Sequence, residues 1–131
     1  LLIVTTPDVP TLSTTVKAVR IAKKRDAQIS GLILNKVYNR KFEIPIKDVE
    51  STAETPVLAV IPYDIDFPKS LSEYKPYTSY SPNSKGSMEF RKLAHIISGE
   101  RYRGFDWKRF LKISPSKSDI NREIYYENVF K

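Results

Sequence analysis

Three short apolar runs, each followed by a polar loop and a candidate helix, most constrain how this chain can fold. The runs span residues 1–5, 29–35 and 57–61, and their branched apolar residues are typical of buried strands. Strands that alternate with helices pair in parallel, because a parallel neighbour can be reached only through a crossover connection. The sequence therefore predicts an α/β fold whose three strands form a parallel sheet.

Three helices are predicted, the first and the last from apolar residues at helical spacing and all three from their end signals. The first covers about 10–25, with its apolar stripe at Leu12, Val16 and Val19. A short second helix is expected over 45–53, ended by the proline at 56. The third covers about 82–98, starts at the Ser81-Pro82-Asn83-Ser84 signal, with Ser81 as the capping residue beside the proline, and stops at Gly99.

Two stretches are predicted to lack regular structure. Residues 38–42 are polar and basic, which indicates a surface turn. Residues 62–82 contain four prolines and are expected to be irregular, with at most one helical turn over 71–74.

The first four residues of the first run, Leu1-Leu2-Ile3-Val4, are all apolar, which predicts a strand buried on both faces with a neighbour on either side. A chain that starts inside such a strand is expected to be part of something longer. Three strands also do not make a well-protected doubly wound sheet by themselves, because they leave edges open. Both observations favour a fragment whose remaining strands lie outside this sequence.

Composition excludes several classes of site. The chain has no cysteine, which rules out disulfides, thiol catalysis and cysteine-ligated metals and fits a reducing cytoplasm. His95 stands alone, so neither a histidine metal site nor a Ser–His–acid set can be assembled. The net charge of +7, from 22 basic and 15 acidic residues, permits nucleic acid, nucleotide or an anionic membrane as partner. A merely solvated basic surface explains the same charge.

Ligands of open parallel sheets bind beyond the carboxyl ends of the strands, so the loops after the three runs are the candidate site. Asn35 offers an amide donor and acceptor that match an adenine edge, or it satisfies backbone groups at the strand end. Pro62 offers a flat ring for a purine face, or it only fixes the turn. Asp64 can accept from an exocyclic amine or cap a turn. Asp8 is predicted to cap the first helix.

The same segments resemble the MinD/ParA ATPases, a deviant Walker A branch of the P-loop proteins. Residues 2–8, Leu-Ile-Val-Thr-Thr-Pro-Asp, resemble the family's strand after switch II. Residues 31–37, Gly-Leu-Ile-Leu-Asn-Lys-Val, are similar to its G-[VL]-[VI]-[VL]-N-[RK] strand, and residues 55–64 to its P-V-L-x-x-I-P-x-D segment. Residues 80–84 resemble its closing element. The match covers about 1–99.

The resemblance implies that residues 1–99 are the C-terminal half of a doubly wound, mostly parallel P-loop sheet, without the N-terminal phosphate-binding half. The family's adenine pocket then falls on Asn35, Pro62 and Asp64. The resemblance also implies ATP, with Mg²⁺ in the full-length parent, as the cofactor and a homodimer as the parent's assembly. No G-x-x-x-x-G-K-[ST] loop occurs in the sequence, so this chain contains no catalytic residues by this reading. We expect the parent to be an ATPase and this chain alone to be inactive, with weak nucleotide binding.

Residues 100–131 lie outside the resemblance and form a basic, aromatic C-terminal extension. Within residues 101–113, Trp107, Phe110 and Leu111 share one helical side, which permits peripheral membrane contact or packing onto the domain. The resemblance implies a cytoplasmic switch protein in division-site placement or in DNA or cargo partitioning, and contact through residues 101–113 would make it membrane-associated. The alternative is a non-enzymatic basic module that binds nucleic acid or a protein partner.

Overall fold

The computed structural model describes residues 1–99 of the chain. The chain divides into two units, residues 1–90 and 91–131. The first unit holds nearly all described elements, and the described part of the second continues the last helix. The predictions for residues 100–131, including the membrane-contact stretch 101–113, fall outside the described residues.

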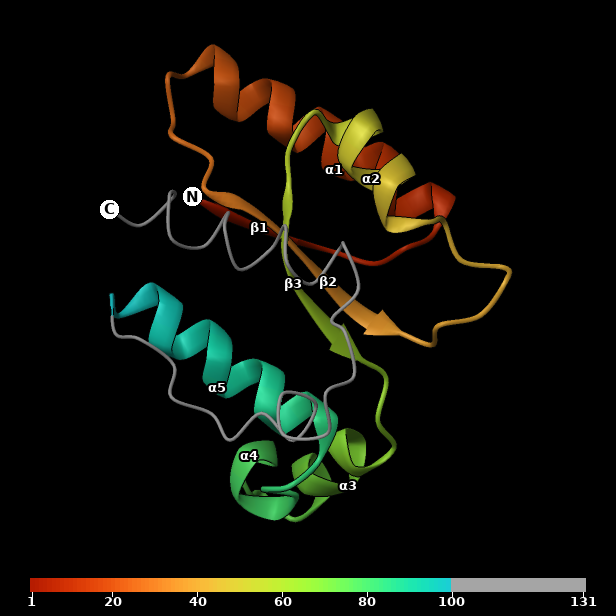
Figure 1. The fold of residues 1–131 in the computed structure, drawn as a ribbon, viewed down its shortest axis with the longest axis vertical. Coiled ribbons are helices and arrows are strands. Elements are labelled where there is room, and N and C mark those ends of the chain that lie inside the picture. Colours follow the sequence, from red (N-terminus) through yellow and green to blue (C-terminus); the bar gives the residue numbers. More distant parts are fainter. Residues whose placement is uncertain (100–131) are drawn as a thin grey trace, which may run out of the picture. The chain divides into compact units, whose positions relative to one another are not determined.

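A parallel three-stranded sheet organises the first unit, as the sequence predicts. Its strands are β1 (Leu2–Thr5), β2 (Gly31–Val37) and β3 (Val57–Pro62), in the spatial order β1-β2-β3. β1 pairs with β2 in parallel, with Val4 opposite Ile33, and β2 pairs with β3 in the same sense. The arrowheads of β2 and β3 point the same way in Figure 1. The predicted α/β class with parallel pairing is therefore confirmed.

Two helices pack on one face of this sheet. They are α1 (Val9–Lys24) and α2 (Ile46–Ala53), close to the predicted 10–25 and 45–53. The core between them and the sheet consists of Leu12, Val19, Leu32, Leu34, Val49, Ala53 and Val57. The stripe that predicted α1 supplies two of these residues, and Val16 packs against them. Burial of this stripe, more than helix propensity, holds α1 in place.

The pairing of β2 with β3 contains two irregularities that cancel. Leu32 lies opposite Val57 and Ile33 opposite Ala59, so β3 carries one extra residue, Leu58. Further along, β2 carries an extra residue between Leu34 and Val37, which restores the first register. Gly31 accommodates the first bulge, because a Cβ there would lie 2.4 Å from the Leu58 Cγ.

β1 differs from the expectation of a strand buried on both faces. Leu2 and Ile3 are half-buried, and Val4 is 59% exposed. Within residues 1–99, β1 pairs only with β2, so its other edge and the Val4 face carry no cover there. Within residues 1–99 this strand is therefore not buried on both faces, and the expected neighbour on its other edge, outside this sequence, stays a prediction.

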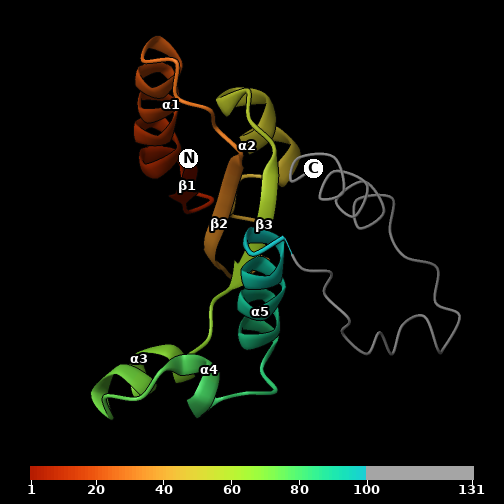
Figure 2. The ribbon, with the colours of Figure 1, turned by 90° about the vertical axis from the view of Figure 1, so that its left-hand side faces the viewer.

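The region expected to be irregular contains two short helices. They are α3 (Asp66–Ser72) and α4 (Tyr77–Tyr80), and they lie away from the layer of α1 and α2 (Figures 1 and 2). Pro68 is the third residue of α3, where a missing N–H costs no helical bond, and Pro76 precedes α4. The predicted turn at 71–74 is misplaced, because Tyr74 has a φ of 53° and follows the helix end.

The last helix, α5 (Lys85–Ile97), starts three residues later than predicted. Ser84 caps it, because the Ser84 side-chain oxygen accepts a hydrogen bond from the Ser87 N–H at 3.1 Å. Ser81, the predicted start, donates instead to Asp66 Oδ2 at 2.9 Å. The cap was misassigned because two serines with the same capping chemistry stand close together.

Candidate functional site

The carboxyl ends of β2 and β3 meet at one edge of the sheet. Val37 pairs with Pro62, and the Tyr63 N–H donates to the Val37 carbonyl at 2.9 Å. The loop after β1 reaches the same region, because the Ile44 N–H donates to the Pro7 carbonyl at 3.0 Å. The two predicted residues Asn35 and Pro62 thus lie on neighbouring strands at the end where parallel sheets bind ligands.

Asn35 occupies the bulge in β2. The next residue, Lys36, has a φ of 54°, and the Asn35 Oδ1 accepts the Lys36 N–H at 2.9 Å. Satisfying a local backbone group was the simpler of the two predicted roles, and Oδ1 does so. Among residues 1–99, the side-chain Nδ2 of this half-buried amide has no hydrogen-bond partner. The two N–H donors and one lone pair on Oδ1 therefore remain available to a planar ligand edge.

Asp64 is held by two hydrogen bonds. Its Oδ1 accepts the Asp66 N–H at 2.9 Å, which is the turn-capping role that the sequence offered as an alternative. Its Oδ2 accepts the Tyr77 hydroxyl at 2.5 Å. A carboxylate oxygen accepts more than one hydrogen bond, so both oxygens can still receive a ligand donor. Pro62, two residues earlier, is half-buried at the end of β3.

Asp8 has the predicted capping role at α1. Its Oδ1 accepts the Thr11 N–H at 2.9 Å, and its Oδ2 accepts the Thr6 hydroxyl. These hydrogen bonds, that from Thr6 first, lower the pKa of the Asp8 carboxyl below its ordinary value. Asp8 therefore serves the helix and not the candidate site.

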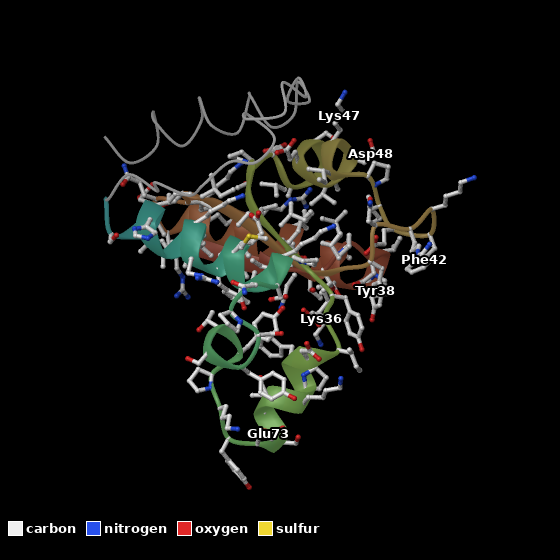
Figure 3. The ribbon with its side chains drawn as sticks, turned by 60° about the horizontal axis from the view of Figure 1, so that its bottom comes forward. Lys36, Tyr38, Phe42, Lys47, Asp48 and Glu73 are labelled. Carbon is white, nitrogen blue, oxygen red and sulfur yellow. The ribbon has the colours of Figure 1, made fainter. Side chains whose placement is uncertain are left out.

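Exposed aromatic rings border the same sheet edge. Tyr38 stacks on Tyr63 with ring centroids 4.5 Å apart, and Phe42 lies 6.1 Å from Tyr38. As whole residues, Tyr38 is 49% exposed, Tyr63 42% and Phe42 76%. Figure 3 shows Tyr38 and Phe42 side by side on the segment after β2, which also carries Arg40 and Lys41. The sequence placed residues 38–42 on the surface but gave no sign of the stack with Tyr63.

Sequence reasoning also missed the residues that surround Asp64. Tyr77 lies in the stretch expected to be irregular, and Ser84 was treated only as part of a helix start. One sign was present: Gly86 stands in the first turn of a helix, where most residues would raise helix propensity. A glycine at such a position indicates a close approach by another group.

The described residues contain no cluster of three acidic or histidine side chains able to hold a metal ion. Within the same part of the chain, no helix has the length and apolar character that crossing a bilayer requires.

The chain is similar to nucleotide-binding proteins over most of its described part. Residues 5–77 match the CobQ/CobB/MinD/ParA nucleotide-binding domain. An uncharacterized ATP-binding protein of Methanocaldococcus jannaschii is 28% identical over 102 residues, which cover 78% of this chain and 39% of that protein.

Two solved structures show a similar arrangement. The septum site-determining protein MinD of Pyrococcus horikoshii, in complex with Mg-ADP, is 34% identical with a TM-score of 0.67, covering 73% of this chain and 40% of that one. The cell division ATPase MinD of Pyrococcus furiosus is 37% identical with a TM-score of 0.68, covering 75% and 41%. The chain thus spans about two fifths of the length of these relatives.

Proposed function

Because this chain belongs to the CobQ/CobB/MinD/ParA family of nucleotide-binding domains, we propose that it supplies the adenine-facing side of an ATP site. Asn35, Pro62 and Asp64 are the residues that meet the base. The observation that carries the proposal is the Asn35 amide, whose Nδ2 has no partner among residues 1–99 at the ligand-binding edge of the sheet.

The chemistry of an amide at this position favours adenine over guanine. Adenine presents a donor and an acceptor on one edge, which an Asn side chain matches with its oxygen and its nitrogen. Guanine presents two acceptors there, so the Asn35 oxygen would face a second oxygen. Asp64 accepts the other hydrogen of the adenine amine, and the Pro62 ring packs on the purine face.

The whole protein, in this proposal, is an ATP-dependent switch of the MinD/ParA type that dimerises and acts in division-site placement or in partitioning of DNA or cargo. Phosphate groups of ATP are held mainly by a glycine-rich loop at a helix N-terminus, and residues 1–131 contain no such motif. Base recognition and phosphate chemistry are therefore assigned to different parts of the parent. We expect no phosphate release from ATP by this chain above a buffer control.

The test is a titration of the isotope-labelled chain with adenosine and with guanosine, followed by amide NMR. Adenosine is expected to shift the signals of Asn35, Tyr63 and Asp64 and to bind more tightly than guanosine by about five- to 150-fold, the scale of one bidentate base contact. The variant Asn35→Asp keeps the acceptor for the Lys36 N–H but removes both donors, so it should lose this preference.

The matched control is Asn83→Asp, which makes the same change at an exposed residue. Equal affinities for the two nucleosides, or a preference that survives in Asn35→Asp, would remove the base site from consideration.

A second candidate, a nucleic-acid-binding module, is favoured by one observation. The exposed rings of Tyr38 and Phe42 stand on a segment that also carries Arg40 and Lys41. Stacking rings beside cationic side chains are typical of surfaces that bind single-stranded nucleic acid.

A further inference from the structure

The Tyr77 hydroxyl lies in the middle of a hydrogen-bond chain that ends on Asp64. Tyr77 donates to the Asp64 Oδ2 at 2.5 Å, and its oxygen accepts from the Ser84 hydroxyl at 2.8 Å. Ser84 in turn accepts the Ser87 N–H at 3.1 Å. Because Ser84 occupies the acceptor side of the Tyr77 oxygen, the Tyr77 proton is directed at the carboxylate.

The ring that carries this hydroxyl is fixed on several sides. Tyr77 is only 7% exposed and packs against Phe67 and Phe90, with ring centroids 5.1 and 6.2 Å away. Gly86 lets the first turn of α5 close on it, because a Cβ there would lie 2.5 Å from the hydroxyl oxygen. Burial, together with the bond to Asp64, raises the pKa of Tyr77, so the hydroxyl keeps the proton that it donates.

The Tyr77 hydroxyl supplies the second of the two hydrogen bonds that hold Asp64. The Asp66 N–H holds Oδ1 and the Tyr77 hydroxyl holds Oδ2, so both ends of the carboxylate are constrained. With one bond alone, the carboxylate can still rotate about its terminal torsion, which has a broad minimum. With both, its remaining lone pairs point in set directions.

We infer that Tyr77 is a positioning residue that orients the Asp64 carboxylate to accept the exocyclic amine of adenine. The inference rests on the proposed base site. Tyr77, supported by Ser84 and Gly86, is a site residue that does not lie at a strand end. Recognition of the adenine amine therefore depends on α4 and on the start of α5.

A nucleoside that lacks the amine separates positioning from simple structural support. Purine riboside has the same ring and sugar as adenosine but offers no hydrogen to Asp64. If Tyr77 acts through Asp64, Tyr77→Phe weakens adenosine binding about fivefold, the scale of one net hydrogen bond, and leaves purine riboside binding unchanged. The matched control is Tyr74→Phe, which deletes a hydroxyl from a side chain that is 97% exposed.

The other outcomes overturn the inference in distinguishable ways. Equal weakening of both nucleosides by Tyr77→Phe would mean that the hydroxyl only supports the fold, and unchanged adenosine binding would mean that it does nothing for the base. If the unsubstituted chain bound adenosine no better than guanosine, the base site itself would fall, and this inference with it.

A second variant keeps the test valid if Tyr77→Phe does not fold. Ser84→Ala leaves the Tyr77 ring in place and frees the acceptor side of its hydroxyl, and it also removes the Ser84 cap of α5, which is expected to affect both nucleosides equally if it affects binding at all. We expect it to weaken adenosine binding by a smaller factor than Tyr77→Phe does, and by more than it weakens purine riboside binding. An equal effect on both nucleosides would contradict the inference.

Discussion

Gly86 has no side chain, yet it decides how closely α5 approaches Tyr77. The hydroxyl oxygen of Tyr77 would lie 2.5 Å from a Cβ at position 86, and two ring carbons would lie at 3.0 and 3.2 Å. Contacts below 3.0 Å require that something move, and the Tyr77 ring is confined by Phe67 and Phe90. The cost of a methyl group here therefore exceeds the gain in helix propensity that alanine brings.

Gly86→Ala is expected to lower the free energy of unfolding by about 1–3 kcal/mol, the usual cost of overpacking. In the Tyr77→Phe background the closest contact disappears, so the same substitution should cost less or become stabilising. Urea denaturation of the four combinations measures the coupling. Stabilisation by Gly86→Ala in the unsubstituted chain would contradict the close approach.

From the sequence, only those residues of the candidate site that stand at the ends of strands could be predicted. Asn35 and Pro62 were located because each stands where an apolar run ends, and parallel strands bring such ends to one edge. The partner of Asp64 could not be found in this way, because Tyr77 lies thirteen residues further on. The helix between them, α3, shows no apolar periodicity in the sequence from which it could be predicted. The bulge that carries Asn35 was also unpredicted, since residues 35–37 contain no glycine that would mark it.

Among the elements, α1 is the one whose beginning is best determined. Asp8 accepts the Thr11 N–H in the first turn, and its hydrogen bonds with Thr6 and Thr11 lower its pKa. A carboxyl whose folded pKa lies below its unfolded value stabilises the fold above the unfolded pKa, and this contribution is lost as pH falls through the folded pKa.

Asp8→Ala should lower the free energy of unfolding at neutral pH by about 0.5–1 kcal/mol, at the low end for a cap because the side chain is exposed. The difference from the unsubstituted chain should shrink as pH falls below the ordinary value of 3.8. Thermal or urea unfolding at several pH values provides the measurement. Asp8→Asn, which retains a capping oxygen, serves as control, and a loss as large as that of alanine would argue against the cap.

Sequence predicted the long elements and failed on the short ones for a physical reason. α1 and α2 bury apolar residues against the sheet, so these residues recur in the sequence at helical spacing. α3 and α4 span seven and four residues, too few to repeat a period, and each has a proline in its first turn or just before it. Their order comes from contacts such as Ser81 with Asp66, which join residues fifteen positions apart.

The whole molecule carries a net charge of +7, which favours any anionic ligand without selecting one. The two candidate functions differ in how they use this charge. Adenosine is uncharged, so its recognition by Asn35 and Asp64 depends on shape and hydrogen bonds. Single-stranded nucleic acid would release counterions on binding, and its affinity would fall with salt.

We therefore expect the adenosine-induced shifts at Asn35 to be the same at low and high salt, whereas any binding of single-stranded DNA falls steeply. Fluorescence anisotropy with labelled DNA measures the affinity for single-stranded DNA at each salt concentration. Phe42→Ala, a change at a residue that is 76% exposed, tests whether stacking contributes to that affinity. Tight DNA binding that persisted at high salt would fit neither candidate. Adenosine binding that weakened steeply with salt would contradict a site that recognises an uncharged base.

The paired bulges of β2 and β3 restrict how this protein can change in length. The extra residue Leu58 in β3 shifts the register of its pairing with β2 by one residue, and the extra residue before Val37 in β2 shifts the register back. Only the pairs in the middle of the two strands therefore have the shifted register. A deletion or insertion in one strand alone would turn the side chains beyond it to the wrong face. An insertion or deletion in β2 should therefore be tolerated only together with a matching one in β3. The loop over residues 38–45 can lengthen without changing the register of the strands.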